Sequence, residues 1–326
     1  MNDPEDHGGN RPTMRADRPS RRYSFWLSLI FPLVVLGIVL ANVDLAAVLR
    51  SLKGADPVLT LGAFLLLSLT PIGLLALRWQ WALRRLYGIE LSFRVVITEF
   101  WMALFAGYCM PAGFGSDVFR VIRLGRRSGG IPANAAVVAG EKAWTLLISG
   151  VLVLVAYPLV ISKVSASPVV SRVIVTIAGL AALAVTALLL ILIFKGPLKR
   201  RVRWALPRLL SPFFRWRNLA VGLGLTLAVQ LIASCGGWLL LLALGVNLPL
   251  IVHVFVWALM NFVMFLPVTI AGLGLREASF ILLFGFFGVS REAALAASLL
   301  ALGCALVSIV PGAIFLAVHT VRGRPR

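Results

Sequence analysis

The stretch VVITEFWMALFAGYCMPAGFGSDVFR covers residues 95–120. It begins with an apolar run that ends at a proline, and closely spaced glycines and charges follow within the same stretch. Basic residues lie on both sides of the apolar run. They are Arg78, Arg84, Arg85 and Arg94 before it, and Arg120, Arg123, Arg126 and Arg127 after it. Basic loops remain in the cytoplasm, so a single crossing would place one of them on the wrong side. We therefore predict that residues 95–117 form a re-entrant hairpin, which turns at residues 111–115 within a space shielded by protein or filled with water.

The composition places the rest of the chain in a membrane as well. Of the 326 residues, 60% are hydrophobic and 13% are charged, and the mean hydropathy is +0.97. A soluble domain has about half apolar residues and about a quarter charged residues. The net charge of +19 comes from basic residues between apolar runs. This is the positive-inside pattern, and it does not indicate a nucleic-acid partner.

The remaining apolar runs predict an all-α polytopic membrane protein with about eight transmembrane helices, because each run is near the ~20 residues that cross a bilayer. The predicted crossings are residues 25–41, 58–77, 137–161, 173–194, 219–244, 252–270, 273–289 and 293–318. This even number places both termini in the cytoplasm of a cell whose inner or plasma membrane holds the protein. We expect one membrane domain, residues 23–320, between basic tails at 1–22, which is expected to be disordered, and 321–326. An alternative is that 273–289 is a second re-entrant segment.

A second stretch, PVTIAGLGLRE at residues 267–277, resembles PAGFGSDVFR at residues 111–120. Each has a proline that ends an apolar run, then a Gly-x-Gly, then an arginine close to an acidic residue. Paired interrupted segments in the two halves of a chain are typical of transporters built on an inverted repeat, with the site at the breaks. The alternative is two ordinary helix ends that use glycine and proline as breakers. The breaker residues are Pro111, Gly113, Gly115, Pro267, Gly272 and Gly274.

Four acidic residues fall in or beside apolar runs, and each would cost about 2.5–3.5 kcal/mol at the centre of a helix exposed to lipid. They are Glu99, Asp117, Glu141 and Glu277. Each therefore needs a partner, a polar cavity or the interface. For Glu99 the candidate partners are Arg94 and Arg78, or the carboxyl is neutral.

The other three acidic residues each have a structural and a functional interpretation. Asp117 either caps the amphipathic stretch 118–127, with the arginines of that stretch pointing to headgroups, or faces a polar cavity together with Arg120. The Glu141–Lys142 pair is either solvated or part of a site. Arg276 cannot lose its charge and needs an anion, which is Glu277, another carboxylate or a lipid phosphate.

Several other residue patterns narrow the function. No motif for nucleotide, metal or nucleophilic chemistry is present, so we expect no cofactor, no metal and no enzyme activity. Cys109, Cys235 and Cys304 form no CxxC pair. His253 is predicted at the interface and Trp79 in an aromatic belt near a segment end.

Four stretches of the chain together resemble a known family. They are RWQWALRRLYGIELSFRV at 78–95, PAGFGSDVFRVIRLGRRSG at 111–129, GEKAW at 140–144 and PVTIAGLGLREASFILLFGFFGVSREAALAASLL at 267–300. They are similar to the lysylphosphatidylglycerol synthase transmembrane-region family, also called flippase-like, over about residues 25–320. Some members carry a cytosolic aminoacyl-transferase domain for which this chain has no room, so the resemblance implies the flippase-like membrane part alone. The chain departs from the family pattern at Thr269, where serine is usual, and at Lys142, where arginine is common.

The resemblance and the misplaced charges together lead to one main hypothesis. The protein is expected to bind an anionic phospholipid, a polyprenyl-phosphate-linked lipid or a related amphiphile and to move it between leaflets, with a separate lipid-synthesising enzyme as a possible partner. The expected headgroup site consists of Asp117, Arg120, Glu141, Lys142, Thr269, Arg276 and Glu277. The alternatives are a membrane-embedded lipid-modifying transferase and a structural or regulatory subunit without transport.

Overall fold

The computed structural model describes Val34 and residues 36–109, 115–128, 130–163, 211–265 and 272–322. Within these ranges the chain forms helices and no strand, which confirms the predicted all-α class. Some predictions concern segments outside the described residues. They are the tail 1–22, most of the run 25–41, the crossing 173–194, most of the tail 321–326, and Pro111, Gly113, Pro267 and Thr269.

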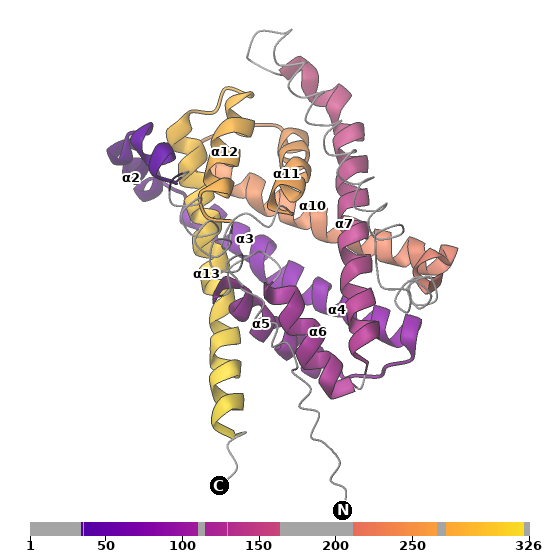
Figure 1. Ribbon diagram of the computed structural model, residues 1–326. Helices are drawn as coiled ribbons and strands as arrows, with labels where there is room; N and C mark the ends of the chain where they lie inside the picture. The colour runs from indigo at the N-terminus through magenta and orange to yellow at the C-terminus, as the bar shows by residue number, and fades with distance from the viewer. Residues whose placement is uncertain are drawn as a thin grey trace, which may run out of the picture.

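Ten α-helices lie in the described part of the chain (Figure 1). They are α2 (Leu45–Lys53), α3 (Pro57–Phe64), α4 (Thr70–Tyr87), α5 (Phe93–Cys109), α6 (Gly115–Ser128), α7 (Ile131–Val160), α10 (Trp216–Ala243), α11 (Leu250–Met264), α12 (Leu275–Gly285) and α13 (Arg291–Arg322). A π-helical turn, Leu65–Leu69, joins α3 to α4, so that residues 57–87 form one continuous helix. Asp44 and Asp56 cap α2 and α3 by accepting hydrogen bonds from the first free backbone N–H groups.

Four helices in the described ranges are long and apolar enough to cross a membrane. They are Pro57–Tyr87, Ile131–Val160, Trp216–Ala243 and Arg291–His319. They coincide with four of the predicted crossings, 58–77, 137–161, 219–244 and 293–318, and extend beyond most of their predicted ends. The chain is therefore a multi-pass helical membrane protein.

Two helices near the C-terminal end are too short to cross a bilayer alone. α11 has 15 residues and α12 has 11 residues, which correspond to lengths of about 22 Å and about 17 Å. The hydrocarbon core is about 30 Å thick. The prediction that 273–289 crosses as a single helix therefore does not fit the length of α12.

Helices α5 and α6 form an antiparallel pair. Glu99 on α5 forms ion pairs with Arg123 and Arg127 on α6. Near the other end of the pair, Gly107 lies against Ser116. The start of α5 thus contacts the end of α6, and the end of α5 contacts the start of α6. The two helices therefore lie antiparallel, and the re-entrant path predicted from the basic loops stays a prediction.

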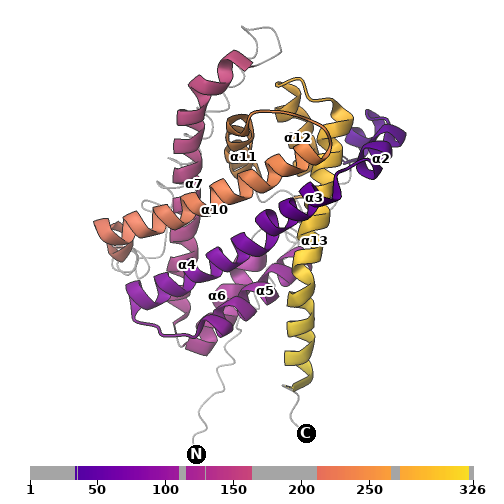
Figure 2. The ribbon, with the colours of Figure 1, turned by 180° about the vertical axis from the view of Figure 1, so that it is seen from behind.

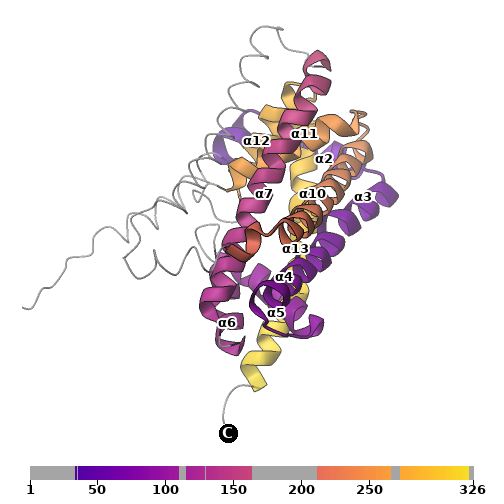
Figure 3. The ribbon, with the colours of Figure 1, turned by 90° about the vertical axis from the view of Figure 1, so that its right-hand side faces the viewer.

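The two halves of the chain use the same order of elements and exchange their packing partners. Each half has a long helix, then a short pair (α5–α6 or α11–α12), then another long helix, α7 or α13. α5 packs on α13 and α11 packs on α7, while α6 and α12 contact the long helix that follows each of them. Figure 3 places α6 and α12 near opposite ends of the molecule, and in Figure 1 α7 and α13 run in opposite directions. The shared order of elements and the opposite directions of α7 and α13 are what an inverted repeat predicts, and the repeat itself stays a prediction.

The leading long helices of the two halves also lie side by side. α10 contacts α3, the π-helical turn and α4 (Figure 2). The backbone N–H of Asp56 donates to the carbonyl of Ala243 at one end of this pair, and Arg78 reaches Thr226 towards the other end. The two helices are therefore antiparallel.

Close contacts between the long helices depend on glycines without side chains. A Cβ atom at Gly312 on α13 would overlap the backbone carbonyl of Trp101 on α5. At Gly222 on α10, a Cβ atom would overlap the indole ring of Trp144 on α7. Small residues at such positions let helices in membranes approach closely and pack without lipid between them.

We expect Gly312→Ala to lower the free energy of unfolding by about 1–3 kcal/mol, because the backbone of α5 cannot move aside as a flexible side chain would. Gly303→Ala is the matched control, since a Cβ atom at Gly303 on the same helix meets nothing within 4 Å. Thermal unfolding of both variants in detergent checks the prediction. An equal melting temperature for the two variants would contradict the close α5–α13 contact.

Candidate functional site

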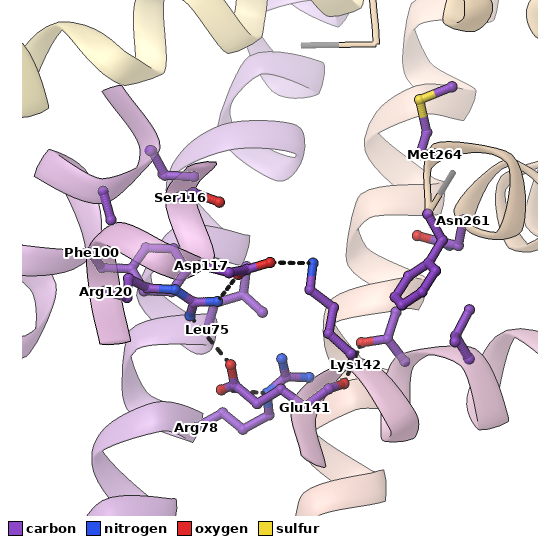
Figure 4. Close-up of a pocket in the computed structure, with 15 residues that line it drawn as sticks. Leu75, Arg78, Phe100, Ser116, Asp117, Arg120, Glu141, Lys142, Asn261 and Met264 are labelled. Atoms are coloured by element: carbon purple, nitrogen blue, oxygen red, sulfur yellow. Dashed lines mark hydrogen bonds and ion pairs between the residues drawn. The ribbon is translucent and has the colours of Figure 1, made fainter. Parts of the chain in front are cut away.

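A cluster of five charged side chains lies where α4, α6 and α7 meet (Figure 4). Asp117 and Arg120 come from α6, Glu141 and Lys142 are consecutive residues of α7, and Arg78 comes from α4. Lys142 exposes 37% of its side chain, whereas the other four expose between 3% and 8%. The structure thus brings together four of the residues expected at the site and adds Arg78.

The charges in this cluster alternate along a chain of ion pairs. The Glu141 carboxylate accepts from Arg78 Nε and from Arg120 Nη1, each at 3.3 Å. Arg120 Nη2 donates to Asp117 Oδ1 at 2.5 Å, and Lys142 Nζ lies 3.0 Å from Asp117 Oδ2. Both oxygens of Asp117 therefore lie within ion-pair distance of a cation. The interpretation of Asp117 as a cap alone is not what the structure shows.

The two arginines of the cluster have further contacts that fix their positions. Arg78 Nη1 donates to the hydroxyl of Thr226 on α10 at 2.8 Å. The Arg120 guanidinium lies 4.9 Å from the ring centre of Trp79 and 4.8 Å from that of Phe100. Such cation–π contacts stabilise a desolvated arginine without neutralising its charge. Both arginines are therefore held rigidly, and Lys142 is the most accessible cation.

A cavity of about 270 Å³, here called the charged cavity, opens between these side chains. Among the described residues, the five members of the cluster are the only charged ones that line it. Three cations and two carboxylates leave one excess positive charge. Each cation already has a carboxylate partner, so the excess charge belongs to the cluster as a whole, and Lys142 is its most exposed member. The other walls of the charged cavity come from α4, α5 and α11, including Asn261 and Met264 (Figure 4).

The remaining two described site residues lie apart from the charged cavity. Arg276 Nε and Nη2 donate to Glu277 Oε1 at 3.1 Å and 3.0 Å, and Ser298 also donates to this oxygen. Tyr108 on α5 lines the same cavity as Arg276. Arg276 lines a different cavity of about 380 Å³, here called the second cavity. The expectation that Arg276 and Glu277 share one cavity with Asp117 and Arg120 is therefore wrong, and Glu277 is the anion that Arg276 required.

The structure also corrects the environment of Glu99 and of helix α6. Glu99 is 1% exposed and is held by Arg123 Nε at 2.6 Å and Arg127 Nη1 at 2.8 Å, not by Arg94 or Arg78. The arginines at 120, 123 and 127 thus bind carboxylates within the protein instead of all pointing to headgroups. Val118 and Ile122, by contrast, are 50% and 42% exposed. Helix α6 thus buries Asp117 and Arg120, while Arg126, Arg127 and part of its apolar surface are exposed.

Two aromatic residues differ from their predicted places. Trp79 is fully buried beneath Arg120 and is not part of an aromatic belt. His253 is fully buried as well, between Trp257 and Phe284, and is not interfacial. Trp79 lies on α4, which continues past the predicted segment end at residue 77. His253 lies on α11, which packs on α7, α10 and α12.

The sequence reasoning missed three polar contributors to the site. The apolar run ends at residue 77, which predicts Arg78 in a loop, whereas α4 continues to Tyr87. The signal was the lack of any glycine or proline before Gly88. Thr226 and Asn261 carry no charge and stand inside apolar runs, so their place at the site depends on helix packing. Asn261 Nδ2 donates to Gln230 Oε1 at 2.9 Å, which continues the polar network into α10.

The described residues also limit the cofactor chemistry that the site can hold. Among them, no group of three His, Cys, Asp or Glu side chains has the arrangement of a metal site. The cluster offers guanidinium and ammonium donors, which bind phosphate and carboxylate groups. The site can therefore recognise an anion through hydrogen bonds and charge.

The fold and the site together define a multi-pass helical membrane protein with a buried, positively charged cavity. The chain matches the family model described as lysylphosphatidylglycerol synthase TM region over residues 25–312. It therefore belongs to that family, as the resemblance of its motifs implied, and is a lipid-related membrane protein. A comparison with curated proteins gave no match.

We expect Glu141→Gln to lower the free energy of unfolding by about 3–5 kcal/mol, because it leaves two buried arginines short of a negative charge. The matched control is Glu90→Gln, since Glu90 pairs with Arg84 and both side chains are more than 70% exposed. That change should cost less than about 1 kcal/mol. Chemical unfolding of both variants in detergent measures the difference. Equal losses would mean that Glu141 is not a buried counter-ion.

Proposed function

We propose that this protein binds the anionic headgroup of a membrane amphiphile in the charged cavity and moves it from one leaflet to the other. The observation that carries the proposal is the excess positive charge around a cavity of about 270 Å³, within helices of membrane-spanning length. Membership of a lipid-related membrane family supports the same conclusion. The candidate substrates are an anionic phospholipid and a polyprenyl-phosphate-linked lipid.

The headgroup phosphate would replace Asp117 as the ion-pair partner of Lys142 and Arg120. Arginine binds phosphate through two parallel hydrogen bonds, and lysine adds a mobile point charge. Lys142 is the partly exposed cation, so it meets the headgroup first. Asp117 remains beside the bound phosphate and limits the affinity, which allows the lipid to leave again.

The inverted repeat supplies a route for alternating access. In our proposal α5–α6 enters the membrane from the cytoplasm, α11–α12 enters from the opposite side, and both termini are cytoplasmic. The contact between α5 and α13 joins the first short pair to the second half, and the contact between α11 and α7 joins the second short pair to the first half. A movement of one half against the other would then open the site to one leaflet at a time. Downhill flow or a gradient would drive the net movement.

Two features disfavour the alternatives. A lipid-modifying transferase needs a carboxylate that is free to reach the substrate, but Asp117 and Glu141 are each held in ion pairs with two cations. A purely structural subunit would pair its polar residues with no space between them. The polar residues here are paired, yet a cavity lies among them.

The test is a leaflet-accessibility assay on purified protein in phosphatidylcholine vesicles that contain labelled phosphatidylglycerol or labelled polyprenyl phosphate. We expect wild type to move at least one of them, and Arg120→Ala and Asp117→Asn to slow that movement about tenfold, since hydrogen bonds to charged groups contribute about 1.5–3 kcal/mol. Arg84→Ala is the control, because Arg84 lies on α4 with Arg78 but is exposed.

Three results would contradict the proposal. The first is that neither anionic lipid moves faster than labelled phosphatidylcholine. The second is that Arg120→Ala and Asp117→Asn both match wild type. The third is a covalently changed lipid in the same vesicles, found by mass spectrometry, which would favour the transferase. Arg276→Ala, outside the charged cavity, should have a smaller effect than Arg120→Ala.

A further inference from the structure

The second cavity lies directly beside the charged cavity. Four residues line both cavities, namely Leu75 from α4, Leu104 from α5, and Asn261 and Met264 from α11. The wall between the two spaces is therefore only one layer of side chains. Met264 is part of this wall, and methionine is flexible enough to change rotamer without repacking its neighbours.

The two cavities differ in charge. Among the described residues, Arg276 is the only charged one that lines the second cavity. Its charge is neutralised by Glu277, and Tyr108 lines the same cavity. The rest of the lining is mainly apolar, with Leu67, Ile72, Met260 and Phe280 among its members. One compartment thus attracts an anion, and its neighbour is neutral and suited to hydrocarbon.

We propose that the second cavity holds the part of the hydrocarbon chain nearest the headgroup of the amphiphile whose headgroup occupies the charged cavity. This inference rests on the proposed function and adds that the chain is enclosed by α4, α5, α11, α12 and α13 instead of remaining in the surrounding lipid. It follows that the protein selects an amphiphile over a soluble phosphate of the same headgroup. Glycerol phosphate would fill only the charged cavity.

Cys304 provides a natural reporter of occupancy, because it is buried on α13 and lines the second cavity. In the double variant Cys109→Ser, Cys235→Ser, it is the remaining thiol. We expect phosphatidylglycerol or polyprenyl phosphate in phosphatidylcholine vesicles to slow its modification by N-ethylmaleimide at least threefold. Glycerol phosphate should not protect it, and Arg120→Ala should remove the protection. A protein that keeps only Cys235, which does not line the second cavity, is the control for global changes.

A second pair of variants tests the same compartment from its α13 wall. Ala305→Trp would fill the second cavity, whereas Val307→Trp places the same side chain on an outward face of α13, where Val307 is 57% exposed. We expect Ala305→Trp to slow lipid movement about tenfold and Val307→Trp to leave it unchanged. If Ala305→Trp fails to fold, the protection of Cys304 in the cysteine variant decides the question.

The outcomes separate this inference from the proposed function. If an anionic lipid moves in an Arg120-dependent way but neither protects Cys304 nor responds to Ala305→Trp, the enclosed chain is wrong and the headgroup site stands. If no anionic lipid moves or protects Cys304, both proposals fail. If glycerol phosphate protects Cys304 as well as the lipids do, the second cavity binds headgroups and the assignment to the chain is overturned.

Discussion

The carboxylate of Glu141 is the interaction on which the rest of the charged cavity depends. It receives Arg78 from α4 and Arg120 from α6 while itself belonging to α7. Helix α4 and the consecutive helices α6 and α7 are thereby fixed around one pair of oxygen atoms. Without this carboxylate, the buried Arg78 would lose its ion-pair partner and Arg120 would keep only Asp117. Arg120 also pairs with Asp117, which in turn pairs with Lys142, so the positions of these two side chains depend on Glu141 through Arg120.

Part of this arrangement could be predicted from the sequence, because a charged side chain in a membrane segment needs a partner, a polar cavity or the interface. Basic loops on both sides of residues 95–111 indicated the antiparallel pair of α5 and α6, and the acidic residues in apolar runs led to Asp117, Arg120, Glu141 and Lys142. Charge alone could not locate Arg78, since the same residue type serves as a topology signal in loops. It also could not separate Arg276 from the others, because which pairs share a cavity depends on how distant helices pack.

The exchange of packing partners explains why the two halves act as one domain. One helix of each short pair packs on the long helix that ends the other half, α5 on α13 and α11 on α7. The same exchange places the charged cavity and the second cavity on either side of α11 residues Asn261 and Met264. In the proposed function, a single helix would therefore contact the occupants of both spaces. This gives a physical basis for coupling headgroup binding to movement of the second half.

The inward charges of α6 also have a consequence for biogenesis. A helix of 14 residues with four arginines is a poor substrate for insertion, yet its Val118 and Ile122 surface is unsuited to water. Glu99 on the preceding helix neutralises part of this charge through Arg123 and Arg127. The two helices therefore have to leave the insertion machinery together, as a preformed pair. Glu141, supplied only after α7 has been made, then closes the cluster of ion pairs, and α11 adds the last wall of the charged cavity later in synthesis.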